Sequence, residues 1–385
     1  MCSIREIYYM EKSKYKIKNT LGMFDLLKGA VMFSMIIGHT YGLNDNYQNS
    51  VITLILTGIM TFFGEAAMPA LLIVSGYGFR KTTTGKCLHR LFKTLLIPFF
   101  VTVVLTAAVH LVTRTIFYGS FIYQIKESLK IFLGGLLGVT QTVSIAGHDV
   151  YDCGPIWFMM ALVVSSLLFN ELLKCFEGKY LFIASLIISC VGWVLSLGPG
   201  LPLTFSQGLV ATLYICIGYM AKKEKFFVSF SDAKKMVKII VPTIIVYLLF
   251  KGAGGTFYMA HNTYSYGPIA IFVNALVATL IIIGFLHLNR FSGRISDVFR
   301  NVGRNSLYVL CAHSIEYIAI GSRLQVEFAD GWEGQVWLRN LIIISIRIII
   351  DFILAYGYVE VKKILSKKLE GVKDFKLFGG FIYGR

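Results

Sequence analysis

Hydrophobic residues fill long stretches of this chain, and short polar segments separate them. Ten stretches are apolar enough to predict membrane-spanning helices, because about 20 apolar residues cross the hydrocarbon core of a bilayer. A further stretch, 121–139, carries charges among apolar residues at helical spacing, which predicts an amphipathic helix on the membrane surface. The predicted spans are 21–43, 51–79, 95–118, 155–174, 180–197, 201–221, 236–251, 267–288, 304–322 and 335–362.

Positive charges alternate between the predicted loops. Lysine and arginine gather at 80–93, 174–179, 222–235 and 290–300 and after 362, whereas 44–50 and 198–200 contain none. Because cytoplasmic loops are enriched in these residues, the alternation predicts about ten helices with both termini in the cytoplasm. The fold class is therefore an all-α, polytopic membrane protein.

Composition supports this class and excludes others. The chain has 385 residues, of which 56% are hydrophobic and 15% are charged, and a soluble protein of this size cannot bury so much apolar surface. The net charge of +16 lies in short loops, so we assign it to orientation and to anionic lipid, not to nucleic acid. The seven cysteines show no metal-binding spacing and imply neither a disulfide framework nor a metal site.

We expect one membrane domain with short polar ends. Residues 1–20 form a basic cytoplasmic segment and no cleavable signal, since the apolar run that follows is too long for one. The transmembrane domain covers 21–364, and 365–385 form a cytoplasmic tail. The predicted location is the cell membrane, with several passes through the bilayer.

The first predicted helix carries two polar residues of special interest, Lys28 and His39. Eleven residues separate them, which is about three helical turns, so both side chains lie on one face and roughly 16 Å apart. A lone lysine or histidine in such a helix marks function by default. A neutral imidazole can accept a proton from a hydroxyl group near pH 7. We expect this face to line a passage that holds a long cofactor at one end and reacts at the other. The alternatives are a lysine paired with Asp25 and a structural histidine.

Other polar residues lie inside predicted spans. Glu65 must be paired or protonated, and a partnership with Lys28 and a role in the passage are both open. His313 and Glu316 share one helix face. Arg347 and Asp351, four residues apart, are most simply a mutual buried pair.

Several short motifs have a structural and a functional interpretation. The run Ser75-Gly76-Tyr77 permits close helix packing, or it forms a narrow cradle for a ligand. Arg90 and Lys93 anchor the chain at the cytoplasmic surface, or they bind phosphates. Trp157 is typical of a membrane interface. The sequence contains no Walker motif and no HExxH zinc motif, which argues against ATP-driven transport and zinc protease chemistry.

These motifs, in this order, resemble those of the acyltransferase 3 family of integral-membrane acyltransferases. The resemblance covers roughly residues 20–360. Its first element is Asp25 followed by Lys28 and, after ten intervening residues, His39. The other elements are the Ser-Gly-aromatic run at Ser75, the cations Arg90 and Lys93 before Pro98, Trp157-Phe158, and the late block Gly303, Asn305, Ser306 and His313. Lysine stands at 28 and at 93 where arginine is commoner, which keeps the charge but weakens bidentate phosphate recognition.

The resemblance implies transfer of an acyl group from a cytosolic acyl-CoA, with acetyl-CoA the favoured donor. The catalytic candidates are His39 as general base, with Lys28 and Glu65. The donor-binding candidates are Lys28, Ser75, Tyr77, Arg80, Arg90 and Lys93, and further candidates are Trp157, Asn305, Ser306 and His313. Ser75 or Tyr77 is also a candidate donor to the oxyanion. No metal is implied.

The acceptor would be a hydroxyl of a glycan or lipid-linked sugar at the outer side of the membrane. We expect no C-terminal hydrolase-like domain of the kind that some members carry. Two other functions stay open at this point: a secondary transporter or flippase for a lipid-linked sugar or organic anion, which would use the intramembrane ionisable residues for proton coupling, and a scaffold without chemistry. The sequence leaves the oligomeric state open, a homodimer included.

Overall fold

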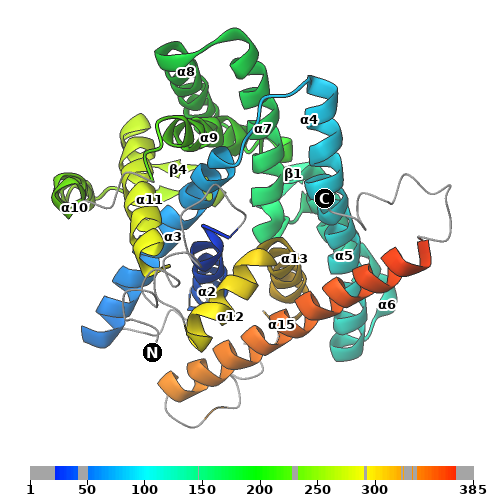
Figure 1. Ribbon diagram of the computed structural model, residues 1–385. Helices are drawn as coiled ribbons and strands as arrows, with labels where there is room; N and C mark the ends of the chain where they lie inside the picture. Colours follow the sequence, from blue (N-terminus) through cyan, green and yellow to red (C-terminus); the bar gives the residue numbers. More distant parts are fainter. Residues whose placement is uncertain are drawn as a thin grey trace, which may run out of the picture.

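The computed structural model describes residues 22–41, 51–145, 147–227, 233–289, 293–321, 324, 332 and 336–369, and this part of the chain is almost entirely α-helical (Figure 1). Each of the ten predicted spans contains a helix. These helices are α2 (Asp25–Tyr41), α3 (Val51–Tyr77), α5 (Ile97–Tyr118), α7 (Trp157–Cys175), α8 (Gly178–Ser196), α9 (Phe205–Lys223), α10 (Ala233–Gly252), α11 (Pro268–Leu288), α13 (Ser306–Glu316) and α15 (Val336–Leu369).

Six helical segments within the described residues are long and apolar enough to cross a membrane: Thr84–Tyr118, Gly154–Cys175, Gly178–Ser196, Pro202–Lys223, Pro268–Leu288 and Leu338–Val361. The protein is thus an all-α, multi-pass membrane protein, as predicted. A total of ten spans and the cytoplasmic position of both termini remain predictions. The predicted N-terminal segment 1–20 lies outside the described residues, as does the tail beyond the end of α15.

Shorter elements connect the long helices. The connecting helices are α4 (Thr84–Leu91), α6 (Phe121–Leu137) and α12 (Arg294–Arg304). Two antiparallel hairpins pair β1 (Val143–Ile145) with β2 (His148–Val150) and β3 (Phe257–Tyr258) with β4 (Thr263–Tyr264). Single turns of 3₁₀-helix form at Gly154–Ile156, Pro202–Thr204 and Met259–His261, and π-helical turns form at Phe92–Leu96 and Tyr317–Gly321.

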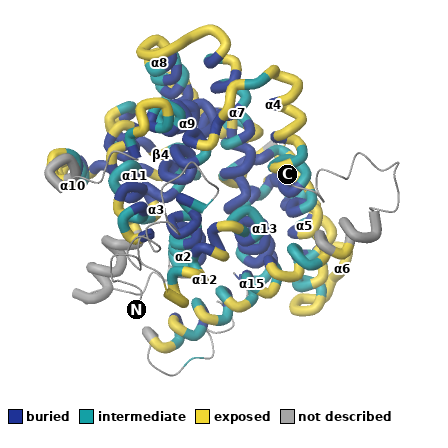
Figure 2. Tube along the Cα trace, in the orientation of Figure 1, coloured by how far each residue is buried: buried dark blue, intermediate teal, exposed yellow. Residues whose placement is uncertain are grey.

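Helices α3 and α9 pack closely against each other. Figure 1 shows the arrangement of the helices around them. Small residues bring the two backbones together, because a Cβ atom on Gly76 would lie 2.1 Å from the carbonyl oxygen of Ile215, and one on Gly218 would lie 1.9 Å from that of Ile73. Figure 2 shows α9 and much of α7 and α11 buried, whereas α6 and α8 are exposed over much of their length. The predicted close packing at Ser75-Gly76 is therefore confirmed for Gly76.

The exposed helix faces are apolar, as expected for surfaces that meet lipid. On α5 the side chains of Val112, Ile116 and Phe117 are exposed, and on α8 those of Ile183 and Ile187 are exposed. Water would make such a continuous apolar surface unfavourable, whereas hydrocarbon does not.

Helix α6 confirms a helix in the predicted amphipathic stretch 121–139, whereas its position on the membrane surface stays a prediction. Its outward face carries Ile122, Ile125 and Leu129, whereas Gln124 and Ser128 are buried against the rest of the protein. The Ser128 hydroxyl lies 2.9 Å from His110 Nδ1 on α5. The polar face of α6 therefore points inward, toward α5.

Candidate active site

Helix α2 brings His39 against α13, and α15 packs against both α13 and α2 (Figure 1). His39 Nδ1 lies 2.9 Å from His313 Nε2, and the two rings are nearly parallel, with an interplanar angle of 6°. His313 Nδ1 in turn lies 2.9 Å from Asp351 Oδ2 on α15. His313 and Asp351 are both fully buried. The three side chains form a continuous hydrogen-bonded chain, His39–His313–Asp351.

When Asp351 is ionised, the order of this chain sets the protonation pattern of its neutral imidazoles. An ionised Asp351 can only accept a hydrogen bond, so His313 Nδ1 carries the proton and donates it. His313 Nε2 then has a lone pair, and His39 Nδ1 must donate to it. This leaves the lone pair of His39 on Nε2, free to accept a proton. In that tautomer His39 would have the proton acceptor that a general base requires, and this role for His39 stays a prediction.

Beside this chain, Arg347 on α15 forms a bidentate ion pair with Glu316 on α13. Arg347 Nε lies 2.8 Å from Glu316 Oε1, and Nη2 lies 2.9 Å from Oε2. Both side chains are fully buried. The prediction that Arg347 and Asp351 pair with each other is therefore wrong, because Arg347 pairs with Glu316 and Asp351 binds His313. Residues one helical turn apart on α15 each reach a different residue of α13, because α13 lies along that face of α15.

Replacing Arg347 by methionine should destabilise the protein strongly, since it leaves the Glu316 carboxylate buried without a counter-charge. Breaking one partner of a buried pair costs about 3–5 kcal/mol. We expect a lower apparent Tm in detergent for Arg347→Met, and recovery of most of the loss when Glu316→Gln is added. The exposed Arg294→Met is the matched control. An unchanged Tm for Arg347→Met would show that the pair does not hold α13 to α15.

An aromatic ring covers this group of residues. The Tyr317 ring centroid lies 5.0 Å from that of His39 and 6.0 Å from that of His313. The Arg347 guanidinium lies 5.8 Å from the Tyr317 ring centroid. Tyr317 opens the π-helical turn Tyr317–Gly321. Such turns occur frequently at functional sites, because the wider turn re-aims a side chain relative to a regular helix.

Two polar atoms of the group are buried without a hydrogen-bond partner among the described residues, Arg347 Nη1 and Asp351 Oδ1. His313, Glu316 and Asp351 also offer ligand atoms within 4.8 Å of one another, as a metal site would. Both Glu316 oxygens are already bound by Arg347, however, and a metal ion would lie beside that cation. The donor set fits a proton-transfer network better than it fits a metal.

Lys28 lies at the other end of α2. Its ammonium is 3.6 Å from Asp25 Oδ1, and Asp25 Oδ2 also binds Arg304 Nε at 3.0 Å. The alternative of a pairing with Asp25 is thus realised. Between Lys28 and His39, the same face carries Met32 and Ile36, which are both buried. A passage along this face stays a prediction.

The sequence had left open a pair between Glu65 and Lys28, and the structure gives Glu65 a different partner. Its Oε1 atom accepts a 2.8 Å hydrogen bond from Lys251 at the end of α10 and a 3.4 Å bond from the backbone nitrogen of Phe257. These contacts tie the β3–β4 hairpin and α10 to α3. Glu65 therefore has a partner that explains its burial without a part in the reaction.

Ser75 and Tyr77 are in the last turn of α3, and Tyr77 packs near the Lys28 end of α2. The Ser75 hydroxyl donates to the carbonyl oxygen of Leu71 at 2.8 Å. Tyr77 packs edge-on against Phe24, one turn before Lys28, with ring centroids 5.2 Å apart, and the Lys222 ammonium lies 6.0 Å from its ring. This placement fits donor binding better than an oxyanion contact beside His39.

The basic residues of the α4 region lie elsewhere in the bundle. Arg80 and Arg90 are exposed and Lys93 is half-buried, and the Arg90 guanidinium lies 5.5 Å from the Phe79 ring. Figure 1 shows α4 at the edge of the bundle, separated from α2 by α7 in this view. Among the contacts of the described residues, none joins Lys28 to these three cations. A single phosphate site formed by all four therefore stays a prediction.

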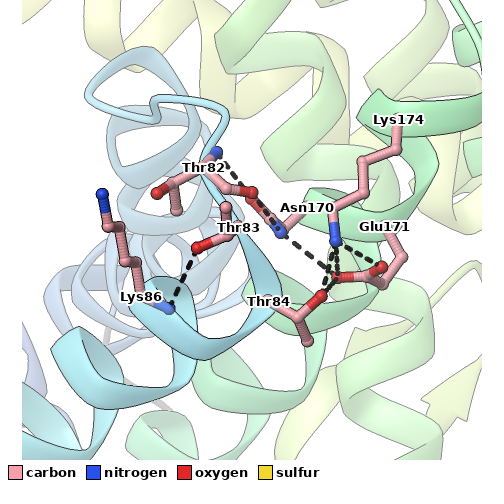
Figure 3. A network of polar contacts seen from close by, with 7 residues as sticks. All are labelled: Thr82, Thr83, Thr84, Lys86, Asn170, Glu171 and Lys174. Carbon is pink, nitrogen blue, oxygen red and sulfur yellow. Dashed lines mark hydrogen bonds and ion pairs between the residues drawn. The ribbon is translucent and has the colours of Figure 1, made fainter.

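A polar network fixes α4 on the end of α7 (Figure 3). Asn170 binds both backbone groups of Thr82, at 3.1 Å through its oxygen and at 3.0 Å through its nitrogen. Glu171 accepts from Thr84 at 3.0 Å and from Lys174 at 2.7 Å. The segment that carries Arg80 and Arg90 therefore has a defined position on the bundle.

The four further candidates are Trp157, Asn305, Ser306 and His313. Among the contacts between residues that the structure describes, His313 is the one of the four that contacts His39. Trp157 is buried against Phe158, and its carbonyl oxygen accepts from Thr204 at 3.4 Å. Asn305 caps the junction between α12 and α13, where its side chain binds the carbonyl oxygen of Asn301 at 3.0 Å. Ser306 is the first residue of α13. These three shape the helices that carry the site.

The fold and this site define a multi-pass helical membrane protein with a buried histidine pair and an acidic residue behind it. A family model described as an acyltransferase domain, that of the acyltransferase 3 family, matches residues 22–356. The chain therefore belongs to the acyltransferase 3 family and is a membrane acyltransferase. No curated protein and no solved structure matches it.

Proposed function

We propose that this protein transfers an acyl group, with acetyl favoured, from cytosolic acyl-CoA to a hydroxyl group of a glycan or lipid-linked sugar at the outer side of the cell membrane. The observation that carries the proposal is the His39–His313–Asp351 chain, which, with Asp351 ionised, would put the lone pair of His39 on Nε2. The family supplies the reaction type, acyl transfer.

In the proposed reaction, the acceptor oxygen attacks the thioester carbonyl while its proton moves to His39 Nε2. His313 and Asp351 stabilise the imidazolium that forms, because Asp351 accepts the hydrogen bond at the far end of the chain. When the tetrahedral intermediate collapses, the C–S bond breaks and His39 returns the proton to the thiolate of CoA. The products are an O-acyl ester and CoA.

The donor would approach from the Lys28 end of α2. Tyr77 packs there on Phe24, one helical turn before Lys28, and the Lys222 ammonium near the Tyr77 ring adds a second cation. Met32 and Met35 lie between this end and His39. Methionine side chains are unbranched and adaptable, so they suit a channel wall that must admit a pantetheine arm.

Lys28→Ala tests this route. Losing a charged contact to a phosphate group should raise the KM for acetyl-CoA about tenfold, while kcat changes little, because the lysine is far from the bond that breaks. CoA should also raise the Tm of the unaltered protein more than that of the variant. An exposed lysine, Lys179→Ala, is the control. Equal CoA affinity in Lys28→Ala would remove Lys28 from donor binding, and a protein that neither binds CoA nor hydrolyses acetyl-CoA would favour a transporter instead.

A further inference from the structure

A cavity of about 650 Å³ lies beside the histidine chain, between the end of α5, the polar face of α6 and the segment after β2. Its volume falls in the range of about 300–1,000 Å³ that is usual for small-molecule sites. The walls include Arg114, Glu127, Tyr151 and Asp152, and Tyr317 closes one side. The same Tyr317 ring lies 5.0 Å from the His39 ring, so one aromatic side chain separates the cavity from the proposed base.

The cavity walls are built with fixed polar groups. The Tyr151 hydroxyl donates to Glu127 Oε2 at 2.6 Å, and Lys130 binds Glu127 Oε1 at 2.8 Å. Burial disfavours ionisation of Glu127, but the hydrogen bonds from Lys130 and Tyr151 outweigh it and hold the pKa of Glu127 below its usual value. The Glu127 carboxylate is therefore charged at neutral pH and held in one position.

One donor in the wall is unused. The Arg114 guanidinium lies 5.3 Å from the Tyr118 ring and donates to the Tyr118 hydroxyl at 3.3 Å. Its Nε atom is buried and has no hydrogen-bond partner among the described residues. Buried donors are nearly always satisfied in folded proteins. An unused buried donor in a cavity wall therefore suggests that a ligand binds there.

The charge balance of the cavity argues against the CoA phosphates as that ligand. The Glu127 and Asp152 carboxylates offset the charges of Arg114 and of Lys130, which is paired with Glu127. The wall therefore has no excess positive charge to select a polyanion, but it can donate to and accept from the hydroxyl groups of a neutral molecule. The tyrosine rings offer flat apolar surfaces for the carbon faces of a sugar ring.

We propose that this cavity is the acceptor site, that it binds a pyranose-type polyol, and that Tyr317 forms the wall past which the acceptor hydroxyl reaches His39. This inference rests on the proposed function. By the predicted topology the cavity lies at the outer end of α5, on the side from which a surface glycan would enter.

The first test uses chemical blocking of the cavity in intact cells. Ser120 lies on the cavity wall and is exposed, and Ser120→Cys is made together with Cys175→Ser to remove an exposed cysteine. A membrane-impermeant maleimide should then reduce O-acetyl groups on surface glycans at least tenfold. Acetyl-CoA hydrolysis without acceptor, measured on membranes from the same cells, should stay within twofold. The Cys175→Ser protein without the new cysteine is the control.

The second test uses a conservative variant. Arg114→Gln should lower surface O-acetylation at least tenfold and leave acetyl-CoA hydrolysis unchanged. Lys179→Gln is the matched control, because Lys179 is an exposed cation whose ammonium lies 5.2 Å from the Tyr180 ring. If transfer and hydrolysis fall together, the cavity either binds the acyl donor or has only a structural role, and the proposal is overturned. Unchanged transfer in both tests would overturn it as well. If the unaltered protein shows neither transfer nor hydrolysis, the proposed function itself is wrong and this inference falls with it.

Discussion

His39→Ala should lower acyl transfer from labelled acetyl-CoA by about 10²–10⁴-fold, which is the usual contribution of a general base. The loss should appear in kcat and in kcat/KM alike, because the imidazole accepts the proton in the transition state. The donor site at the Lys28 end of α2 is untouched, so CoA should raise the Tm of the variant as it does that of the unaltered protein. The measurement is the initial rate in detergent or in membranes, with Tm followed in the presence of CoA.

A second imidazole provides the control for this result. His261 lies in the 3₁₀ turn between β3 and β4, where its ring stacks on Tyr258 with a centroid distance of 4.7 Å, and it is exposed. His261→Ala should keep the rate within about threefold, since surface substitutions are usually mild. Near-normal transfer by His39→Ala in a protein that still binds CoA would remove His39 from the mechanism.

Asp351→Asn should lower kcat by a factor that approaches that of His39→Ala, with little change in the KM for acetyl-CoA. The asparagine amide can donate to His313 Nδ1, which would shift the His313 proton to Nε2 and set two donors against each other at the contact with His39. An analogous replacement in the serine protease triad costs about 10⁴-fold in kcat through the wrong tautomer. Rates measured over a range of acetyl-CoA concentrations separate the two parameters.

An exposed carboxylate is the matched control for Asp351. Asp297 on α12 pairs with Arg300 and its side chain is 68% exposed, so Asp297→Asn should leave the rate almost unchanged. If Asp351→Asn transfers at the normal rate, Asp351 serves packing alone. If it fails to fold, Asp351→Glu offers a second carboxylate, and partial recovery of the rate would support the relay.

The sequence predicted the helices well, because long apolar runs and the distribution of lysine and arginine are local properties of a membrane protein. It also singled out His39, since a lone imidazole inside an apolar helix is recognisable without knowledge of its neighbours. Its partners were less accessible. His39 and His313 are 274 positions apart, and His313 and Asp351 are 38 apart, so their contact depends on how α2, α13 and α15 pack.

The two predicted ion pairs that the structure changes show the same limit. Arg347 and Asp351 have the spacing of a pair within one helix, and Glu65 and Lys28 have similar predicted depths. Tertiary packing gave three of them other partners: Glu316 for Arg347, His313 for Asp351 and Lys251 for Glu65. Lys28 pairs with Asp25 on its own helix, which the sequence had offered as an alternative. The charged residues within apolar spans were the available signal, and they marked which residues needed partners but not which partners they would find.

The most direct test of the relay is a double-mutant cycle on acyl transfer with His313→Ala, Asp351→Asn and the double variant. If Asp351 acts on His39 only through His313, the double variant should transfer at about the rate of the slower single variant, because residues that act as a unit are not additive. If the two losses in kcat multiply instead, in proteins that keep their stabilisation by CoA, the two residues act independently and the His39–His313–Asp351 relay is contradicted.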